Sequence, residues 1–538
     1  MKKTLILILT LLMCIAMLHA QTGEMSADRK LQLAEKVIDL YYVEDVDNDE
    51  IVAEAIKAML KTLDPHSSYS TPEETKEFTQ PLEGKFSGIG IQFNMLEDTV
   101  YVIQTTNGGP SQKVGIMPGD RIVSANDTVI AGKKLKNSDI LKTLRGPKGS
   151  VVDLKVKRGD SPDLIEFRIV RDDIPVYSVE ETFMADPTTG YISISRFAED
   201  TSKEVEKAIA DLKSKGMRNL IIDLSNNGGG FLGSAFELAS QFLPKGVPVV
   251  STSGRATPAM QYDTEKRGNF LDGRLVIITN QYSASASEIL SGAIQDNDRG
   301  LVVGRRTFGK GLVQRPFPFP DGSMIRLTTA RYYTPSGRCI QKHYEKGHGE
   351  EYELDMLNRY SSGELWSADS IQRPDSLKYY TLNNRRPVYG GGGIMPDVFV
   401  PVDTSYYSTY YRDMMAKGVI NRTVINFVDA NRKELLKQYP DDDRFQDYVV
   451  PDVLLARLVE NATAAGIEYN TEQWERSRPM VTAIMKGLLA RDLYKDGSYF
   501  RAIRHLSPDF REAMRLINDP ERYRYILTHG TEPVPVAE

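Results

Sequence analysis

The chain has 538 residues, of which 41% are hydrophobic and 26% are charged, and its formal net charge at pH 7 is −6. A hydrophobic fraction of this size excludes a globally disordered chain, and the length predicts several domains. With 67 basic against 73 acidic residues, the chain lacks the basic excess that a nucleic-acid-binding surface needs, so we expect no nucleic-acid partner.

The N-terminal stretch has the pattern of a secretory signal peptide. Two lysines precede an apolar run over residues 4–18, and Ala20 supplies a small residue at the expected cleavage site. The run is short for a membrane-spanning helix, so we expect no stable span after cleavage. Removal of residues 1–20 takes Cys14 with it and leaves only Cys339, which excludes an intrachain disulfide. The sequence therefore predicts export to a periplasm or cell envelope.

Residues 21–82 have helical character. Apolar side chains recur at helical spacing over residues 31–41 and again over residues 51–60. Thr71 followed by Pro72 predicts the capped start of a further helix, because proline is favoured at the first helical position. Apolar faces of this kind fit packing within the chain and dimerisation equally well, so a homodimer stays open.

Residues 83–172 read as a small β-rich module, with short alternating runs separated by glycines. Residues 86–91 read Phe-Ser-Gly-Ile-Gly-Ile, and residues 115–122 read Gly-Ile-Met-Pro-Gly-Asp-Arg-Ile. In that order they resemble the carboxylate-binding loop and the Gly-Asp-x-Ile signature of PDZ domains. The resemblance implies that a peptide's free C-terminus adds to the sheet edge, held by backbone N–H groups. The implied peptide-binding residues are Gly88, Ile89, Gly90 and Ile91.

Residues 173–405 alternate predicted strands and helices, which favours a largely parallel, buried sheet with crossover helices. An apolar strand over residues 219–224 leads into the glycine-rich run of residues 226–230. The run lacks the Lys-Ser/Thr of a phosphate-binding loop. Its position between a strand and a helix instead lets it present N–H groups to an oxyanion.

Three serines, Ser283, Ser285 and Ser287, follow the apolar strand at residues 276–279, and a helical pattern starts at Glu288. A serine on a strand-to-helix turn suits a nucleophile, because backbone N–H groups and the helix dipole face any oxyanion formed there. Taken alone, Ser-Ala repeats are more typical of helix caps. Their place between two buried strands excludes a linker and favours the catalytic interpretation.

Lys310 lies between two glycines and close to Phe308, after a second apolar strand at residues 301–304. This setting predicts a tightly packed, poorly solvated ammonium, and desolvation lowers the pKa of a lysine toward neutrality. The alternative is a solvated surface charge in a glycine-rich turn. Residues 406–538 are mostly helical patterns with many charges and no chemical motif, so we expect a packing or recognition role there.

Residues from about 30 to 402, taken together, resemble the carboxy-terminal processing (tail-specific) serine proteases. The order and coverage of the shared motifs make this resemblance specific. In chain order they are Leu-Asp-Pro-His-Ser at 63–67, the PDZ-like segment, Asp-Leu-Ser-Asn-Asn-Gly-Gly-Gly at 223–230, Ser-Ala-Ser-Ala-Ser-Glu at 283–288, Thr-Phe-Gly-Lys-Gly at 307–311 with Gln314, Tyr-Thr-Pro-Ser-Gly-Arg at 333–338 and Gly-Ile-Met-Pro-Asp at 393–397.

The resemblance implies a mixed, multi-domain α/β fold and a division of labour along the chain. The expected parts are a signal peptide (1–20), an N-terminal helical region (21–82), a PDZ-like domain (83–172), a ClpP/crotonase-like α/β serine protease core (173–405) and a helical C-terminal region (406–538). Implied partners are protein or peptide substrates with free C-termini, and a homodimer or an adaptor protein stays open. No cofactor and no metal are expected.

The same resemblance assigns roles to individual residues. Its Ser–Lys dyad falls on Ser285 as nucleophile and Lys310 as general base, with Gln314 orienting the lysine. The implied oxyanion hole combines the N–H of Ala286 with one from the turn at Gly229 and Gly230. In this family the PDZ-like domain can cover the protease and swing on ligand binding, and Arg145, at the edge of the module, is a candidate coupling residue. Ser225 departs from the family, which usually has arginine there, and this leaves the support of the strand end in doubt.

Other hydrolytic sites fit the sequence less well. A Ser-His-Asp triad needs a suitable histidine, but His66 falls in the N-terminal helical region, and His343 and His348 fall in a polar insert. There is no Gly-x-Ser-x-Gly elbow, no Ser-x-x-Lys pairing with the serine triplet and no His-Glu-x-x-His. The competing hypotheses are a non-catalytic protein that holds peptide tails on the same fold and a purely structural envelope protein.

Overall fold

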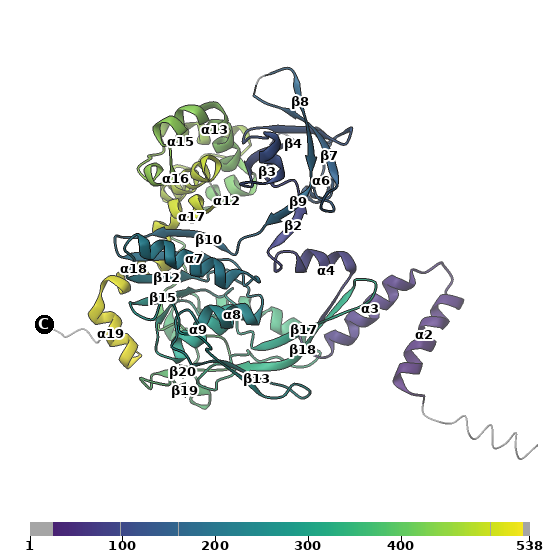
Figure 1. Cartoon of the computed structure of the whole chain (residues 1–538), viewed down its shortest axis with the longest axis vertical. Coiled ribbons are helices and arrows are strands. Elements are labelled where there is room, and N and C mark those ends of the chain that lie inside the picture. The colour runs from purple at the N-terminus through teal and green to yellow at the C-terminus, as the bar shows by residue number, and fades with distance from the viewer. Residues whose placement is uncertain (1–24, 97, 160, 495, 531–538) are drawn as a thin grey trace, which may run out of the picture.

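The computed structural model describes residues 25–530, except residues 97, 160 and 495. The predicted signal peptide over residues 1–20 lies outside this part of the chain. Figure 1 shows N-terminal helices at one end, a β-rich module and a helical cluster side by side, and an α/β core below them. The mixed fold class predicted from the sequence, with its β-rich PDZ-like module, is confirmed.

The N-terminal region reaches the core through a short strand. Helices α2 (Ala27–Tyr41) and α3 (Asn48–Lys61) precede β1 (Ser68–Ser70), which pairs antiparallel with β18 (Met324–Tyr333) of the core. Helix α4 (Pro72–Thr79) begins as predicted, with a capping box between Thr71 and Glu74 and with proline in its first turn. The pairing of β1 carries the Leu-Asp-Pro-His-Ser segment into the core, although this segment lies some 250 residues from β18.

The β-rich module is built on a sheet in the order β3-β4-β5-β7-β8, with β6 paired to β5. Alternate side chains of its strands and of helix α6 share one apolar core. The two-stranded ladder of β2 and β9 connects the module to the rest of the chain (Figure 1). Its elements are β2 (Lys85–Gly88), β3 (Ile91–Leu96), β4 (Thr99–Thr105), α5 (Pro110–Val114), β5 (Arg121–Ala125), β6 (Thr128–Val129), α6 (Asn137–Leu144), β7 (Val151–Lys157), β8 (Leu164–Val170) and β9 (Asp172–Pro175).

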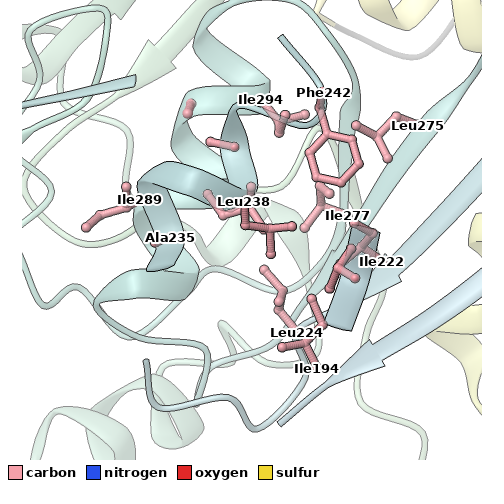
Figure 2. Packing of buried hydrophobic residues seen from close by; sticks show 14 of the residues in the cluster. Ile194, Ile222, Leu224, Ala235, Leu238, Phe242, Leu275, Ile277, Ile289 and Ile294 are labelled. Atoms are coloured by element: carbon pink, nitrogen blue, oxygen red, sulfur yellow. The ribbon is translucent and has the colours of Figure 1, made fainter. Parts of the chain in front are cut away.

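The central sheet has the order β10-β11-β12-β15-β16-β21. From β11 onward the neighbours are parallel, as the predicted βαβ alternation requires, and β10 is antiparallel to β11. Figure 2 shows Leu238 of α8 and Ile294 of α9 in one apolar cluster with Ile222 and Ile277 of the sheet. The elements are β10 (Val179–Met184), β11 (Thr189–Ile194), α7 (Thr201–Ser214), β12 (Asn219–Asp223), α8 (Leu232–Ala239), β15 (Leu275–Thr279), α9 (Ala286–Asp296), β16 (Leu301–Gly304) and β21 (Val398–Phe399).

A second sheet, in the order β1-β18-β13-β14, lies against α9, and β17 pairs with β18. Strand β17 follows the lysine turn directly, so the sheet carries that turn at its margin. A helical insert, whose side chains reach the same turn, comes after β18. These elements are β13 (Pro248–Ser253), β14 (Met260–Asp263), β17 (Leu312–Pro318), α10 (Gly349–Glu353), α11 (Asp355–Ser361), η1 (Ala368–Ser370), η2 (Asp375–Leu377), β19 (Lys378–Tyr380) and β20 (Pro387–Tyr389).

The C-terminal helices divide between two places. Those from α12 to α17 form a cluster with its own apolar core, beside the β-rich module. Helices α18 and α19 instead cover the second face of the central sheet, where Leu516 and Ile526 share a core with Ile221 and Val276. The elements are α12 (Thr409–Ala416), α13 (Val419–Gln438), α14 (Asp442–Phe445), α15 (Asp452–Ala464), α16 (Thr471–Leu493), α17 (Asp496–Ile503), η3 (Arg504–Leu506), α18 (Pro508–Asn518) and α19 (Pro520–His529).

Candidate active site

Ser285 lies at the N-cap of α9, between the end of β15 and the helix, as the sequence predicts. Its φ is 57° and its ψ is −111°, a conformation that side-chain-bearing residues rarely adopt. The two neighbouring serines have buried hydroxyls with structural partners. Ser283 Oγ donates to the carbonyl of Leu224 at 2.7 Å, and Ser287 Oγ donates to the carbonyl of Asn227 at 2.9 Å. Of the triplet, Ser285 is thus the serine on a strained turn whose hydroxyl is not committed to these backbone contacts.

Glu288, in the first turn of α9, ties the serine turn to the lysine turn. Its fully buried carboxylate accepts from the backbone N–H of Ser285 at 2.7 Å and from those of Gly309 and Lys310 at 2.7 and 2.9 Å. The hydroxyl of Thr307 donates to it as well, at 2.5 Å. Burial raises the pKa of Glu288, and these hydrogen bonds oppose that shift. One carboxylate therefore fixes both turns relative to each other.

Lys310 is poorly solvated, as predicted. Burial lowers the pKa of its amine to about 8 from an ordinary 10.5, and the positive charge of Arg326 acts in the same direction. The Nζ atom donates to Gln314 Oε1 at 2.8 Å. Among the described residues, no carboxylate forms an ion pair with Lys310. Its amine can therefore lose its proton close to neutral pH.

Gln314, on β17, has its amide orientation set by a residue from far along the chain. Its Nε2 donates to the backbone carbonyl of His66 at 2.5 Å. Because a carbonyl can only accept, the amide nitrogen must face His66, and the amide oxygen must face Lys310. The segment that contains His66 is itself held by Asp64, whose carboxylate accepts from the N–H groups of His66 and Ser67, both at 2.9 Å.

His66 belongs to the N-terminal region, and its sequence position gives no sign of the residues that it contacts in the fold. Pairing of β1 with β18 brings His66 beside the lysine turn, where its ring lies edge-on to Phe308 with the ring centroids 6.4 Å apart. Burial lowers the pKa of His66 to about 4, and the charge of Lys310 contributes, so the imidazole is neutral at neutral pH. Its Nε2 lies 2.6 Å from the hydroxyl of Tyr352. The ring therefore packs beside the lysine turn.

The helical insert packs against the lysine turn from another side. Arg359 is buried and donates to the carbonyls of Thr307 and Phe308, at 2.8 and 3.0 Å. Lys342 lies over the ring of Phe308, with Nζ 4.0 Å from the ring centroid. These contacts exclude water from the lysine turn, which explains why the amine of Lys310 is desolvated.

The glycine turn after β12 lies directly against the serine. A Cβ atom on Gly229 would come within 2.8 Å of Ser285 Cβ and 3.0 Å of the Ala286 nitrogen, so only glycine fits at this close approach. Gly229 donates its own N–H to Asn227 Oδ1 at 2.9 Å. Gly230 forms a bridge to Phe197, through the flanking Gly229 carbonyl and Phe231 N–H. That geometry leaves the Gly230 N–H on the side away from Phe197.

The predicted carboxylate loop connects β2 to β3 in the β-rich module. Gly88 ends β2, and Gly90 has a φ of 72°, which favours glycine. Ile91 begins β3, which lies at the edge of its sheet. The guanidinium of Arg145 stacks over the ring of Phe86, 4.5 Å from its centroid. Arg145 thus lies against the loop, at the C-cap of α6.

Family comparisons agree with this arrangement. The chain matches peptidase family S41 over residues 188–349, a PDZ domain over residues 87–181 and the N-terminal domain of the activating protease CtpB over residues 16–75. Residues 410–496 match a family of unknown function, DUF8443. The carboxy-terminal processing protease CtpB of Bacillus subtilis (strain 168) is 36% identical over 342 residues, which cover 62% of this chain and 69% of the relative.

The chain belongs to the carboxy-terminal processing proteases of family S41. A probable CtpA-like serine protease of Staphylococcus epidermidis (strain ATCC 12228 / FDA PCI 1200) is 34% identical over 62% of this chain and 68% of its own length. The solved photosystem II D1 C-terminal processing protease is 26% identical, with a TM-score of 0.33, over 58% of this chain and 90% of that one. The protein is accordingly a serine-type peptidase with a PDZ domain.

Glu288 and Asp223 both lie in motifs of the sequence, but their partners became known only from the fold. Glu288 lies inside a recognised motif, but its four donors could not be known without the fold. Asp223 accepts from Arg504, which comes from the C-terminal helices, where no motif was found. Within residues 25–530, apart from the three undescribed positions, no group of acidic, histidine or cysteine side chains could hold a metal ion.

Proposed function

We propose that the protease is an exported serine endopeptidase that cleaves proteins recognised by their C-terminal tails, and that it uses Ser285 and Lys310 as a catalytic dyad. The single observation that carries the dyad is the state of Lys310. A buried amine with a pKa of about 8 and no carboxylate partner is a competent general base near neutral pH. It lies one hydrogen bond from Gln314 and is tied through Glu288 to the serine turn.

The proposed reaction has two stages. Ser285 Oγ attacks the carbonyl carbon of the scissile peptide bond, while neutral Lys310 accepts the hydroxyl proton. Lys310 then returns this proton to the leaving amine, and the new C-terminal fragment departs from the acyl-enzyme. Water, deprotonated by the same lysine, hydrolyses the ester and restores Ser285. Gln314 holds the amine in place through its amide oxygen, whose direction is set by the His66 carbonyl.

The negative charge of each tetrahedral intermediate needs N–H donors. We assign these to Ala286, at the N-terminus of α9, and to the turn at Gly229 and Gly230. The close approach of Gly229 to Ser285 and to the Ala286 nitrogen supports this assignment. Since Gly229 already donates to Asn227, Gly230 is the favoured donor from the turn. Losing one such donor typically costs about 3–4 kcal/mol in the transition state.

Substrate selection is assigned to the PDZ domain. An extended tail adds as a strand alongside the edge strand β3, and its terminal carboxylate binds the N–H groups of Gly88, Ile89, Gly90 and Ile91. Arg145, stacked on Phe86 beside this loop, is placed to respond to an occupied carboxylate site. Apolar last residues of the tail then occupy the space between β3 and α6.

The proposed location is the periplasm or cell envelope, on the evidence of the N-terminal sequence pattern and of bacterial relatives. No helix in the described part of the chain is long and apolar enough to cross a membrane. The exposed apolar side chains of α2 keep a homodimer open, and an adaptor protein also stays a proposal.

Cleavage of an unstructured protein with a free, apolar C-terminus tests the function. Wild-type protein, Ser285→Ala and Lys310→Ala are compared, with a second substrate whose C-terminus is amidated. We expect both variants to be inactive while still binding the free tail, and the amidated substrate to be cleaved more slowly by the wild type. Full proteolysis by folded Lys310→Ala would rule out the dyad, and equal cleavage of both substrates would rule out tail recognition.

A further inference from the structure

Arg504, in the turn η3 after the C-terminal helical cluster, contacts the protease core close to the proposed oxyanion turn. Its Nη1 donates to Asp223 Oδ2 at 2.8 Å, and its guanidinium stacks over the ring of Tyr191, 4.9 Å from the centroid. Both partners are buried: Tyr191 also donates its hydroxyl to Asp223 Oδ2, at 2.7 Å. Figure 1 shows α17, the helix that leads into this turn, between the helical cluster and β10.

Asp223 is the last residue of β12, and its other oxygen acts on the next stretch of chain. Asp223 Oδ1 accepts from the backbone N–H of Ser225 at 2.8 Å. Ser225 begins the turn that runs through Asn226 to Gly230, and the turn is then fixed by its contacts with the serine loop, such as Ala284 N–H to the Asn227 carbonyl at 3.0 Å. Arg504 thus fixes the position of the Asp223 carboxylate, and that carboxylate fixes the first residue of the oxyanion turn.

The residue at position 225 makes this contact more informative. Serine is uncharged and cannot supply a guanidinium to the strand end. The positive charge beside Asp223 comes instead from a segment some 280 residues later in the chain. Without a cationic partner, the buried carboxylate of Asp223 would raise the free energy of the folded protein. It would move toward solvent, and the turn that is hydrogen-bonded to it would move as well.

We propose that Arg504 is a positioning residue for catalysis, which holds the oxyanion turn through Asp223. This inference rests on the proposed function, because it presumes that the turn at Gly229 and Gly230 stabilises the tetrahedral intermediate. Through this residue the C-terminal helical region contributes to catalysis. The guanidinium of Arg504 does so without touching the reacting atoms.

Arg501, one helical turn earlier, provides a matched control. It also stacks over an aromatic ring of the core, that of Phe183, 5.6 Å from the centroid. Its ion pairs, however, are with Asp442 and Asp443 inside the helical cluster, at 3.1 and 2.6 Å. Arg501→Gln therefore removes a comparable charge, ring contact and ion pair without touching Asp223.

The experiment measures kcat and KM on one peptide substrate for the full-length protease. With Arg504→Gln we expect kcat to fall by about 10- to 100-fold, the range that a small misplacement of a catalytic group produces, with KM changed less than about twofold. Affinity for a peptide aldehyde, whose hemiacetal oxygen occupies the oxyanion hole, should fall by the same factor. Arg501→Gln should leave both quantities unchanged.

A double-mutant cycle shows whether Arg504 acts through Asp223. If it does, Arg504→Gln added to Asp223→Asn lowers kcat no further, so the two effects are not additive. Additive effects, or a kcat for folded Arg504→Gln equal to wild type, would overturn the inference. Circular dichroism checks the fold of each variant, and Arg504→Lys, which keeps the charge and should lose less kcat, serves if Arg504→Gln does not fold.

Two parallel controls separate this inference from the proposed function. Ser285→Ala and Lys310→Ala must be inactive if the dyad is correct. Activity in either variant refutes the proposed function itself. Inactive dyad variants together with an unimpaired Arg504→Gln refute only the role of Arg504.

Discussion

Two lysines are buried near the same phenylalanine, and they differ in what compensates their charge. Lys342 forms an ion pair with Asp355 at 3.0 Å, and its ammonium lies 4.0 Å from the centroid of Phe308 and 3.9 Å from that of Tyr352. Lys310 has one neutral acceptor, Gln314, at 2.8 Å. Burial lowers the pKa of both amines. For Lys342 a hydrogen bond and the charge of Asp355 oppose the shift, whereas for Lys310 only the charges of Glu288 and Asp64 oppose it, without a hydrogen bond to either carboxylate.

The difference teaches what makes a buried lysine reactive. Desolvation is common to both side chains, so desolvation alone does not separate a base from a structural cation. A carboxylate and two ring faces stabilise the ammonium of Lys342. An amide oxygen near Lys310 orients the amine without supplying a full negative charge. The carboxylate of Glu288, whose charge acts on Lys310, accepts from four uncharged donors.

The largest expected effect is the difference in activity between a variant that lacks the amine of Lys310 and one that lacks the amine of Lys342. Lys310→Met should reduce kcat/KM by about 10⁴-fold or more, the scale seen when a member of a catalytic unit is lost. Lys342→Met leaves the dyad intact and should cost less than about tenfold, through looser packing on Phe308. Steady-state kinetics on one peptide substrate measure both. Similar losses in two folded variants would mean that the lysines are not functionally distinct.

Gln314→Glu should give Lys310 a carboxylate partner, as Lys342 has in Asp355. A carboxylate at the amide position, 2.8 Å from Nζ, should raise the pKa of Lys310 by about 1–3 units. Activity at neutral pH should fall by about 10- to 1,000-fold and recover at alkaline pH. The measurement is the pH dependence of kcat/KM. Gln314→Met is the control: it removes the acceptor without adding charge, so its activity should fall without an alkaline shift.

The pH dependence of the unaltered protease follows from the pKa of Lys310. In the proposed dyad the neutral amine is the base, so log kcat/KM should rise with pH and level off near pH 8. The same shift affects stability. Between about pH 8 and 10.5 the unfolded chain binds more protons than the folded one, so the contribution of this lysine to the free energy of unfolding rises with pH. In Lys310→Met, denaturant titrations should lack this rise, and a rise of the same size there would assign it to another group.

The smallest expected effect comes from removing the carboxylate that is ion-paired with Lys342. Asp355→Asn should lower the pKa of Lys342 further, so that its amine reacts faster with an acylating reagent at neutral pH. Activity should stay within about twofold of wild type, because the dyad and Gln314 are untouched. Peptide mapping by mass spectrometry measures the labelling of Lys342. Unchanged labelling would show that Asp355 does not hold the charge of this lysine.

The sequence predicted the local setting of the candidate site residues. It did not predict the residues from distant parts of the chain that hold them in place. The strand-to-helix turn at Ser285 and the poorly solvated setting of Lys310 follow from neighbouring residues, and family resemblance singled out Ser285 among the three serines. His66, Tyr352 and Arg359 reach the site through pairing of β1 with β18 and through the folding of a polar insert. No periodicity in a single sequence specifies such long-range contacts, because they depend on which surfaces meet.

The division of the C-terminal helices illustrates the same limit. The pattern of residues 406–538 predicts amphipathic helices, but an apolar face does not identify its partner. Leu516 and Ile526 cover the central sheet, whereas Leu458 and Leu489 pack inside the helical cluster. Similar residues at similar spacing thus serve two different cores, and only the tertiary structure distinguishes them.

Coverage of the central sheet by α18 and α19 has a consequence for the order in which the protease matures. A ribosome makes these helices after every other element in the described part of the chain. Until they arrive, Ile221 and Val276 lack their apolar cover, and Asp223 lacks Arg504. The sheet that carries the serine and glycine turns is therefore covered on both faces only when synthesis is nearly complete.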